Sequence, residues 1–276
     1  MSRYIDHIPS PAHCRRVKLI VLSFSRSDTL GIYNAYNILG YRSYHILEAF
    51  KNGIHHMKIL NEALESGLAR EGKPFNREDF DKWFHGYDVI TEIPCYMAPQ
   101  FVAAYPEAKF LLVERNPGAL VRSWKSTTFQ FTDAMNSFQL SILKYFDPML
   151  YQVSRFWGII LPVVTSGKGT TDEGEKALYQ YYVDYLAKVK EIVPADKIYV
   201  VRLEDGLGWE QLCPILERNI PNDPWPMRHN ADEFKQVMGR PLGPGATRAM
   251  SRLAAVLVPA MGVGAWYLVM EDCDVD

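Results

Sequence analysis

Short apolar segments alternate with amphipathic ones along most of this chain. Four runs rich in Val, Ile and Leu, at 17–24, 87–93, 109–114 and 197–203, predict buried strands. Apolar residues at helical spacing fill most of the intervals between them. Strands that alternate with helices indicate an α/β fold, in which helices flank a central, mainly parallel sheet in three layers. The helices are expected at 29–40, 46–51, 54–67, 76–84, 97–104, 117–130 and 173–192.

The same pattern divides the chain into four parts. Residues 1–16 form an N-terminal extension, 17–238 a single globular domain, 239–252 a Pro/Gly-rich linker and 253–276 an apolar C-terminal segment. The least regular part of the domain is 136–172, which is rich in bulky apolar residues. A substrate-facing cap and a set of packed helices both explain this composition.

The C-terminal segment raises the question of membrane association. Residues 253–270 carry no charge, follow Arg248 and Arg252, and are just long enough to span a bilayer as a helix, although Pro259 interrupts them. A buried terminal helix and a membrane-associated segment, either spanning or interfacial, are both open. The N-terminus has no apolar stretch of signal-peptide length. We therefore expect a cytoplasmic protein, with attachment to an intracellular membrane through 253–270 as an open alternative.

Composition and charge narrow the class of ligand. The chain has 276 residues, 48% of them hydrophobic and 22% charged, and a formal net charge of -2, as in an ordinary globular protein. Its basic residues are scattered, which argues against a nucleic-acid partner and favours a small anion held locally. The four cysteines are far apart and form no CxxC pair, so neither a zinc site nor a disulfide framework is expected. A homodimer is compatible with the sequence.

The loop SFSRSDTLG at 23–31 links the first predicted strand to the first long helix. A sharp strand-to-helix turn presents unpaired backbone N–H groups and the positive end of the helix dipole, which together attract anions. Three hydroxyls and the Arg26 guanidinium add further donors. The GxxxxGK[ST] and GxGxxG spacings are absent, which disfavours an ATP or GTP hydrolase and a dinucleotide-binding enzyme.

A second anion-binding segment follows the third predicted strand. In LLVERNPGALVRSW, at 111–124, Arg115 ends the strand and Ser123 lies on the following helix. A strand-end Arg and a Ser one or two turns into the helix can both bind one phosphate group. Two such segments predict a ligand that carries two separated phosphates.

These segments resemble, in their order along the chain, the P-loop sulfotransferase superfamily, and in particular its fungal and invertebrate branch. The R-T-G-T loop of that branch corresponds to RSDT at 26–29, and its L-G and Y-H-M motifs correspond to LG at 39–40 and YHI at 44–46. The resemblance covers about residues 17–238. It also includes the segments GYDVITEIPC, AAYPEAKFLLVERNP, VRSW, GWEQLCPIL and PWPMRHNADEF.

The resemblance implies a P-loop-type fold and 3′-phosphoadenosine-5′-phosphosulfate as the co-substrate, with no metal. The loop at 25–30 would hold the 5′-phosphosulfate, with Arg26 at the position that stabilises charge on the bridging oxygen. Arg115 and Ser123 match the pair that binds the 3′-phosphate, and Arg228 would add to that site. The implied donor-binding residues are Ser25, Arg26, Ser27, Asp28, Thr29, Leu30, Arg115, Ser123 and Arg228.

Sulfuryl transfer also needs a base for the acceptor. Glu92 ends the strand YDVITE, matches a family Asp, and would lie at the sheet edge where ligands of α/β proteins bind. His45 is the alternative, because imidazole is the commonest general base. Both residues also have a purely structural interpretation, in which Glu92 is a salt-bridged strand-end carboxylate and His45 is a structural histidine. The expected catalytic residues are therefore Glu92, His45 and Arg26.

Asp28 departs from the family pattern, which has Gly at this position. A carboxylate 4 Å from a bound anion is repelled by about 4 kcal/mol at an effective dielectric of about 20. Either the side chain points away, capping the helix, or donor binding is damaged. The first hypothesis is therefore a sulfotransferase that acts on a small apolar or phenolic metabolite. The alternatives are an enzyme of the same fold that performs donor-free acid/base chemistry, such as cyclisation or dehydration, and a noncatalytic membrane-associated binding protein.

Overall fold

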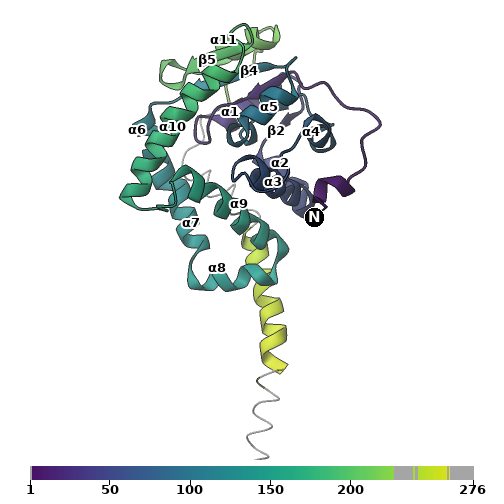
Figure 1. The fold of residues 1–276 in the computed structure, drawn as a ribbon, viewed down its shortest axis with the longest axis vertical. Helices are drawn as coiled ribbons and strands as arrows, with labels where there is room; N and C mark the ends of the chain where they lie inside the picture. The colour runs from purple at the N-terminus through teal and green to yellow at the C-terminus, as the bar shows by residue number, and fades with distance from the viewer. Residues whose placement is uncertain (1, 227–238, 240–241, 260, 262–276) are drawn as a thin grey trace, which may run out of the picture.

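The chain folds around a parallel sheet, as the alternating pattern predicts (Figure 1). The computed structural model describes residues 2–226, 239, 242–259 and 261. Within these residues a five-stranded sheet has the order β2-β3-β1-β4-β5, and every neighbouring pair is parallel. The strands are β1 (Leu19–Val21), β2 (Ser43–Tyr44), β3 (Val89–Ile90), β4 (Lys109–Glu114) and β5 (Ile198–Arg202).

Alternate side chains of the central strand enter two separate cores. Ile20 and Leu22 point into the larger core, whereas Leu19 and Val21 point into the smaller one on the opposite face. All four side chains are fully buried, because successive residues of a strand face opposite sides of the sheet and helices cover both sides. This explains why the central strand is a continuous apolar run.

Helices form the two outer layers of the α/β sandwich. The smaller core lies under α1 (Thr29–Ile38) and α11 (Trp209–Leu212). The larger core lies under helices that include α3 (Gly53–Gly67), α9 (Pro148–Val164) and α10 (Asp172–Ile192). The other α-helices are α2 (Ile46–Lys51), α4 (Arg77–Phe84), α5 (Ala98–Ala104), α6 (Pro117–Trp124), α7 (Gln130–Met135) and α8 (Phe138–Leu143). Short 3-10 segments are η1 (Tyr4–His7), η2 (Ile93–Tyr96), η4 (Lys144–Phe146), η5 (Leu203–Asp205) and η6 (Cys213–Leu216), and η3 (Lys125–Phe129) is a π-helical segment.

Within the globular domain, the structure adds to or departs from the sequence prediction in three places. The edge strand β2 was not predicted, because a strand of two residues is too short to show an alternating pattern of apolar and polar side chains. The helix expected at 117–130 is divided into α6, η3 and the start of α7. The segment 136–172, for which the sequence left a substrate-facing cap and packed helices open, contains α8, η4 and the 17-residue α9. Of the two explanations for its bulky residues, packed helices fit Phe156 and Trp157, which are buried in the larger core.

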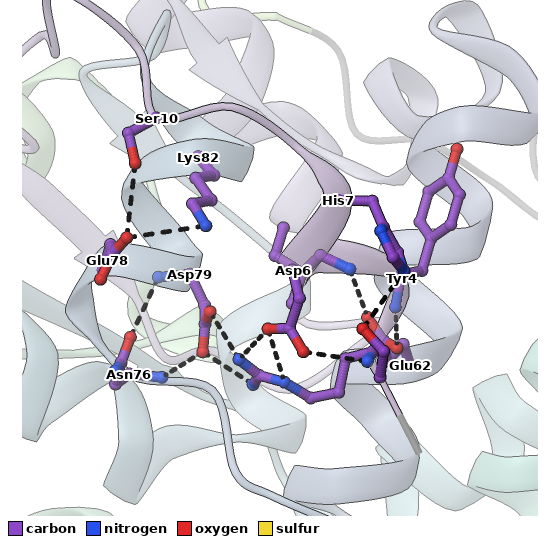
Figure 2. Close-up of polar contacts among 12 residues, drawn as sticks. Tyr4, Asp6, His7, Ser10, Glu62, Asn76, Glu78, Asp79 and Lys82 are labelled. Atoms are coloured by element: carbon purple, nitrogen blue, oxygen red, sulfur yellow. Dashed lines mark hydrogen bonds and ion pairs between the residues drawn. The ribbon is translucent and has the colours of Figure 1, made fainter.

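The N-terminal extension is fastened to the domain by buried polar contacts (Figure 2). Arg3 donates from Nη1 and Nη2 to the two carboxylate oxygens of Asp79 on α4, at 2.8 and 2.9 Å. The carboxylate of Glu62 on α3 accepts the backbone N–H groups of Tyr4 and Ile5, at 2.5 and 2.9 Å. Ile5 is fully buried in the larger core. Residues 2–7 are therefore part of the folded structure.

The segment expected as a linker is helical where it is described. Residues 242–259 form a helix that packs on α9, and Arg248 Nε donates to Asp147 Oδ2 at 2.8 Å. Gly245 lies so close to α9 that a Cβ added to this glycine would be only 3.0 Å from Leu150 Cγ. Among the described residues, no helix combines the length and the apolar character needed to cross a bilayer. Much of the segment 253–270, namely 260 and 262–270, lies outside the described residues.

Candidate active site

The loop after β1 makes a compact turn before α1 begins. The N–H of Ser27 donates to the carbonyl of Phe24 at 3.0 Å, and the N–H of Ile32 donates to the carbonyl of Asp28 at 3.0 Å. Arg26 and Asp28 have positive φ angles of 74° and 62°, a region that residues with a Cβ seldom adopt. Such backbone strain is typical of ligand-binding loops.

Phe24 anchors this loop to the helices around it. Its ring stacks on Trp124 of α6, with ring centroids 5.6 Å apart, and it contacts Tyr182 and Tyr185 of α10 at 5.5 Å each. The indole N–H of Trp124 donates to the carbonyl of Ser25 at 3.3 Å. The loop is thereby held at a fixed distance from α6. The aromatic spacing along the sequence did not reveal this anchor.

The two predicted anion-binding segments meet in the structure. Arg26 Nε donates to Ser123 Oγ at 3.1 Å, so the loop after β1 touches the helix after β4. The guanidinium of Arg115 donates from Nη1 to the carbonyl of Arg26. The N–H of Arg115 donates to the hydroxyl of Tyr182 at 2.9 Å. One polyanion therefore has donors from both segments within its reach.

The two arginines are partly buried, and each feels the charge of the other or of a further arginine as well as of nearby carboxylates. Burial lowers the pKa of Arg26, while Glu92 and Asp28 raise it and Arg115 lowers it further. Burial also lowers the pKa of Arg115, against the effect of Glu204. Arginine remains charged despite such shifts. Two guanidinium groups that repel each other bind an anion more strongly, because the anion relieves their repulsion.

Glu92 and His45, the two candidate bases, form a pair. His45 Nε2 lies 2.6 Å from Glu92 Oε2, and Ser25 donates its hydroxyl to Glu92 Oε1 at 3.2 Å. His45 is the N-cap of α2 and accepts the N–H of Leu47 at Nδ1, at 3.3 Å. Because Nδ1 is an acceptor, Nε2 carries the proton and faces the carboxylate. Nε2 also lies 3.5 Å from the hydroxyl of Thr29 in the loop.

The surroundings of Glu92 keep it ionised. Burial raises the pKa of this carboxyl, but His45, Ser25 and Arg26 together outweigh burial and hold the pKa below its usual value. Its backbone has a φ of 63°, which places the side chain at the turn between β3 and η2. Strain at a non-Gly residue beside a binding loop favours a functional role over that of a simple strand-end carboxylate.

Asp28 occupies the start of α1. It is the N-cap residue, and an added Cβ on Gly31 would lie 2.6 Å from Asp28 Oδ1, so the carboxylate lies against the first turn of the helix. Its charge raises the pKa of both Arg26 and Arg115. The side chain makes no N-cap hydrogen bond to the helix. The carboxylate thus turns inward, toward the cationic groups that a phosphate would use.

A cavity of about 880 Å³ begins next to the Glu92 turn. Cys95 and Tyr96 of η2, three and four residues after Glu92, line one side of it. The thiol of Cys95 donates to the carbonyl of Glu92 at 2.9 Å. The lining also includes Tyr181, Tyr185, Val163 and Ile192, with the exposed Asp184 and Lys188 of α10. The volume suits a small organic molecule with an apolar or aromatic body.

All but one of the predicted site residues lie among the described residues. They lie in the loop after β1 or the first turn of α1, after the C-terminal ends of other strands or on α6: Ser25, Arg26, Ser27, Asp28, Thr29, Leu30, His45, Glu92, Arg115 and Ser123. Arg228 lies outside the described residues. The sequence missed Phe24, Tyr96 and Tyr182, because an aromatic residue that packs in a core and one that positions a loop look alike in sequence. Among the described residues, no group of three His, Cys, Asp or Glu side chains is placed to hold a metal ion.

Comparison with known proteins agrees with this geometry. The family described as the sulfotransferase domain matches residues 18–234. The chain is also similar to "Ava biosynthesis cluster protein M" of Aspergillus versicolor. The two are 27% identical over 217 residues, which cover 76% of this chain and 80% of the relative.

Proposed function

This chain belongs to the sulfotransferase family, and we propose that it transfers a sulfuryl group from 3′-phosphoadenosine-5′-phosphosulfate to a hydroxyl group of a small metabolite. The observation that carries the proposal is the contact between Arg26 and Ser123, which joins two separate anion-binding segments. A nucleotide that carries phosphate groups on two positions of its ribose could contact both segments at once. The relative's place in a biosynthesis cluster supports a small-molecule acceptor.

The donor fits one half of this site better than the other. Arg115 and Ser123 suit the 3′-phosphate, because one gives a fixed fork of donors and the other a hydroxyl. The loop at 25–30 suits the phosphosulfate through its backbone N–H groups and Arg26. The inward carboxylate of Asp28 opposes it. Donor binding therefore requires that Asp28 rotate outward or bind a proton.

The chain's own residues supply the remaining chemistry. The acceptor hydroxyl attacks sulfur, an O–S bond forms, and the bond from sulfur to the bridging phosphate oxygen breaks. The hydroxyl proton passes to Glu92, which His45 orients through its Nε2–H. Arg26 stabilises the charge that develops on the departing phosphate. Enzymes accelerate such transfers mainly by positioning the reactants and by stabilising the charge that develops on them.

The cavity of about 880 Å³ is the proposed acceptor site. Its lining includes Cys95 and Tyr96, three and four residues after Glu92, but not Glu92 itself, so the acceptor hydroxyl would have to reach the base from that end of the cavity. Tyr181 and Tyr185 favour an aromatic or apolar acceptor body, because tyrosine rings stack on flat apolar groups.

The inward position of Asp28 favours a second candidate function. If its carboxylate permanently replaces the donor phosphate as the partner of the loop cations, the Glu92–His45 pair would carry out proton transfer without a donor. Cyclisation or dehydration of a metabolite are reactions of this kind. Glu92 would remain the proton-transfer group in both functions, whereas the donor residues would matter only in the first.

Binding of adenosine 3′,5′-bisphosphate, the donor's product half, distinguishes the two functions. At 100 times its dissociation constant a ligand adds about 2.7 kcal/mol of stability, which raises the melting temperature by about 5 °C or more. We expect a rise for the natural chain and a larger one for Asp28→Gly. Ser123→Ala should remove most of the gain, whereas Ser126→Ala, a neighbouring serine on η3, should not. No rise in either the natural chain or Asp28→Gly would contradict sulfuryl transfer. A reaction that needs no donor and is lost in Glu92→Gln would then establish the second function.

A further inference from the structure

The last described turns of the helix at 242–259 are apolar on every side and exposed on every side. Residues 254–259 are Ala, Ala, Val, Leu, Val and Pro, and all of them are exposed. Val256 and Val258 expose 58% and 62% of their surface, although they lie on different sides of the helix. Figure 1 shows this helix extending away from the domain, below α8 and α9. A helix that is apolar all round is normally surrounded by an apolar medium.

A second exposed apolar surface lies beside the base of this helix. Phe138 and Tyr145 expose 78% and 70% of their surface, and Ile142 between them is also exposed. We call these three residues the α8–η4 ridge. The ridge and the helix are neighbours, because Arg252 Nη1 donates to the carbonyl of Phe146 at 2.8 Å. In addition, Leu253 and Leu140 pack against the same small cluster around Leu150.

The charged residues within the two stretches of chain that contain these surfaces are all basic. Residues 134–146 contain no acidic side chain, and their only charged residue is Lys144. Residues 240–270 also contain no acidic side chain, and they include Arg248 and Arg252. The acidic residues next to these stretches lie outside them, at Asp133, at Asp147 and from Glu271 onward, and the carboxylate of Asp147 is almost fully buried and paired with Arg248. Exposed apolar groups in stretches whose charged residues are all basic match the surface of a bilayer with anionic lipids.

We propose that the α8–η4 ridge and the helix at 242–259 together bind the surface of a phospholipid bilayer that contains anionic lipids. A second copy of this chain fits the observations less well. A helix-to-helix seam needs one apolar stripe, whereas 254–259 are apolar all round. Phenylalanine and tyrosine at the ridge are typical of the membrane interface, where a ring enters the acyl region and a hydroxyl stays among the headgroups. This inference is independent of the reaction at Glu92.

Vesicle flotation of the full chain tests the proposal. Vesicles of phosphatidylcholine alone are compared with vesicles that also contain phosphatidylserine. Phe138→Asp/Tyr145→Asp removes the ridge, and Val256→Asp/Val258→Asp removes the helix end. The matched control is Tyr179→Asp/Ile220→Asp, since both residues are exposed apolar positions elsewhere, at 45% and 55%. Circular dichroism shows that each variant is folded.

We expect the natural chain to bind the anionic vesicles and to bind neutral ones less. Each test pair should lower the partition coefficient at least tenfold, because a buried apolar side chain contributes about 1.5 kcal/mol or more and about 1.4 kcal/mol is tenfold. The control pair should change it less than about threefold, because charges outside the membrane-contacting surface are screened within about a Debye length. Equal losses in the ridge pair and the control pair would overturn the role of the ridge. Membrane binding would be overturned if the natural chain did not bind vesicles and instead formed a dimer that the same substitutions disrupt.

Discussion

His45 Nε2 lies 2.6 Å from the Glu92 carboxylate, so the two candidate bases are partners. The imidazole cannot accept a proton at Nε2 while it donates that nitrogen's hydrogen to Glu92. Its other nitrogen accepts the N–H of Leu47. We infer that Glu92 takes the proton of the acceptor and that His45 positions Glu92 and lowers its pKa.

Glu92→Gln should lower turnover by about 100-fold or more, because removal of a general base costs about 10² to 10⁴ in rate. The amide keeps the shape of the side chain and its contact with Ser25, so the melting temperature should change little. Turnover and bisphosphate binding are measured on the same preparation. Glu114→Gln is the control, since both glutamates lie at the C-terminal side of a strand and both side chains are 16% exposed. Equal losses in the two variants would assign Glu92 a structural role only.

His45→Gln should move the acidic limb of the pH–rate profile to higher pH. The active form of Glu92 is the carboxylate, and its lowered pKa keeps it ionised below the usual value of about 4.3. Without the imidazole, only Ser25 and Arg26 oppose the effect of burial, so the pKa should rise and activity should begin to fall at a higher pH than in the natural chain. The rate at high pH should fall much less, by about tenfold or less. If the limb stays in place while the rate falls equally at every pH, His45 itself is the base.

Arg3→Ala should destabilise the domain by about 3 kcal/mol, because it leaves the buried carboxylate of Asp79 without its cation. Figure 2 shows this contact between the N-terminal segment and α4. Urea unfolding measures the change. Lys188→Ala, which breaks an exposed pair with Glu191, should cost less than about 1 kcal/mol. A loss under about 1 kcal/mol for Arg3→Ala would mean that residues 2–7 do not support the domain.

His56 should make the protein less stable as pH falls. Burial lowers the pKa of this ring to about 4, against about 6.5 in an unfolded chain. Between these values the unfolded chain binds one more proton, so stability is lost as pH drops through this window, by at most about 1.4 kcal/mol per pH unit. Partial exposure of the ring reduces the slope. His56→Gln should weaken the dependence of the melting temperature on pH between pH 6.5 and 4. Replacement of an exposed histidine, as in His13→Gln, should not. Identical slopes for the two variants would contradict this assignment.

The sequence determined the features that depend on neighbours along the chain. The apolar runs at 17–24 and 109–114 became β1 and β4, because buried strands need continuous apolar residues. The anion-binding character of 25–30 and of Arg115 with Ser123 followed from residue types at strand-to-helix turns. The family motifs gave the fold class through the same local signals.

Tertiary structure decided which of these features meet. Nothing in the sequence spacing of His45 and Glu92 predicts that they lie 2.6 Å apart. They meet because β2 and β3 pair in parallel, which brings the C-terminal ends of the two strands together. Prolines and glycines at 239–248 predicted a linker, but small residues such as Gly245 let the chain pack on Leu150 as a helix. The Asp28 carboxylate likewise acts on Arg115, which another strand contributes, as well as on Arg26 of its own loop. Local propensity acts over a few residues, whereas burial and charge act between segments that only the folded chain brings together.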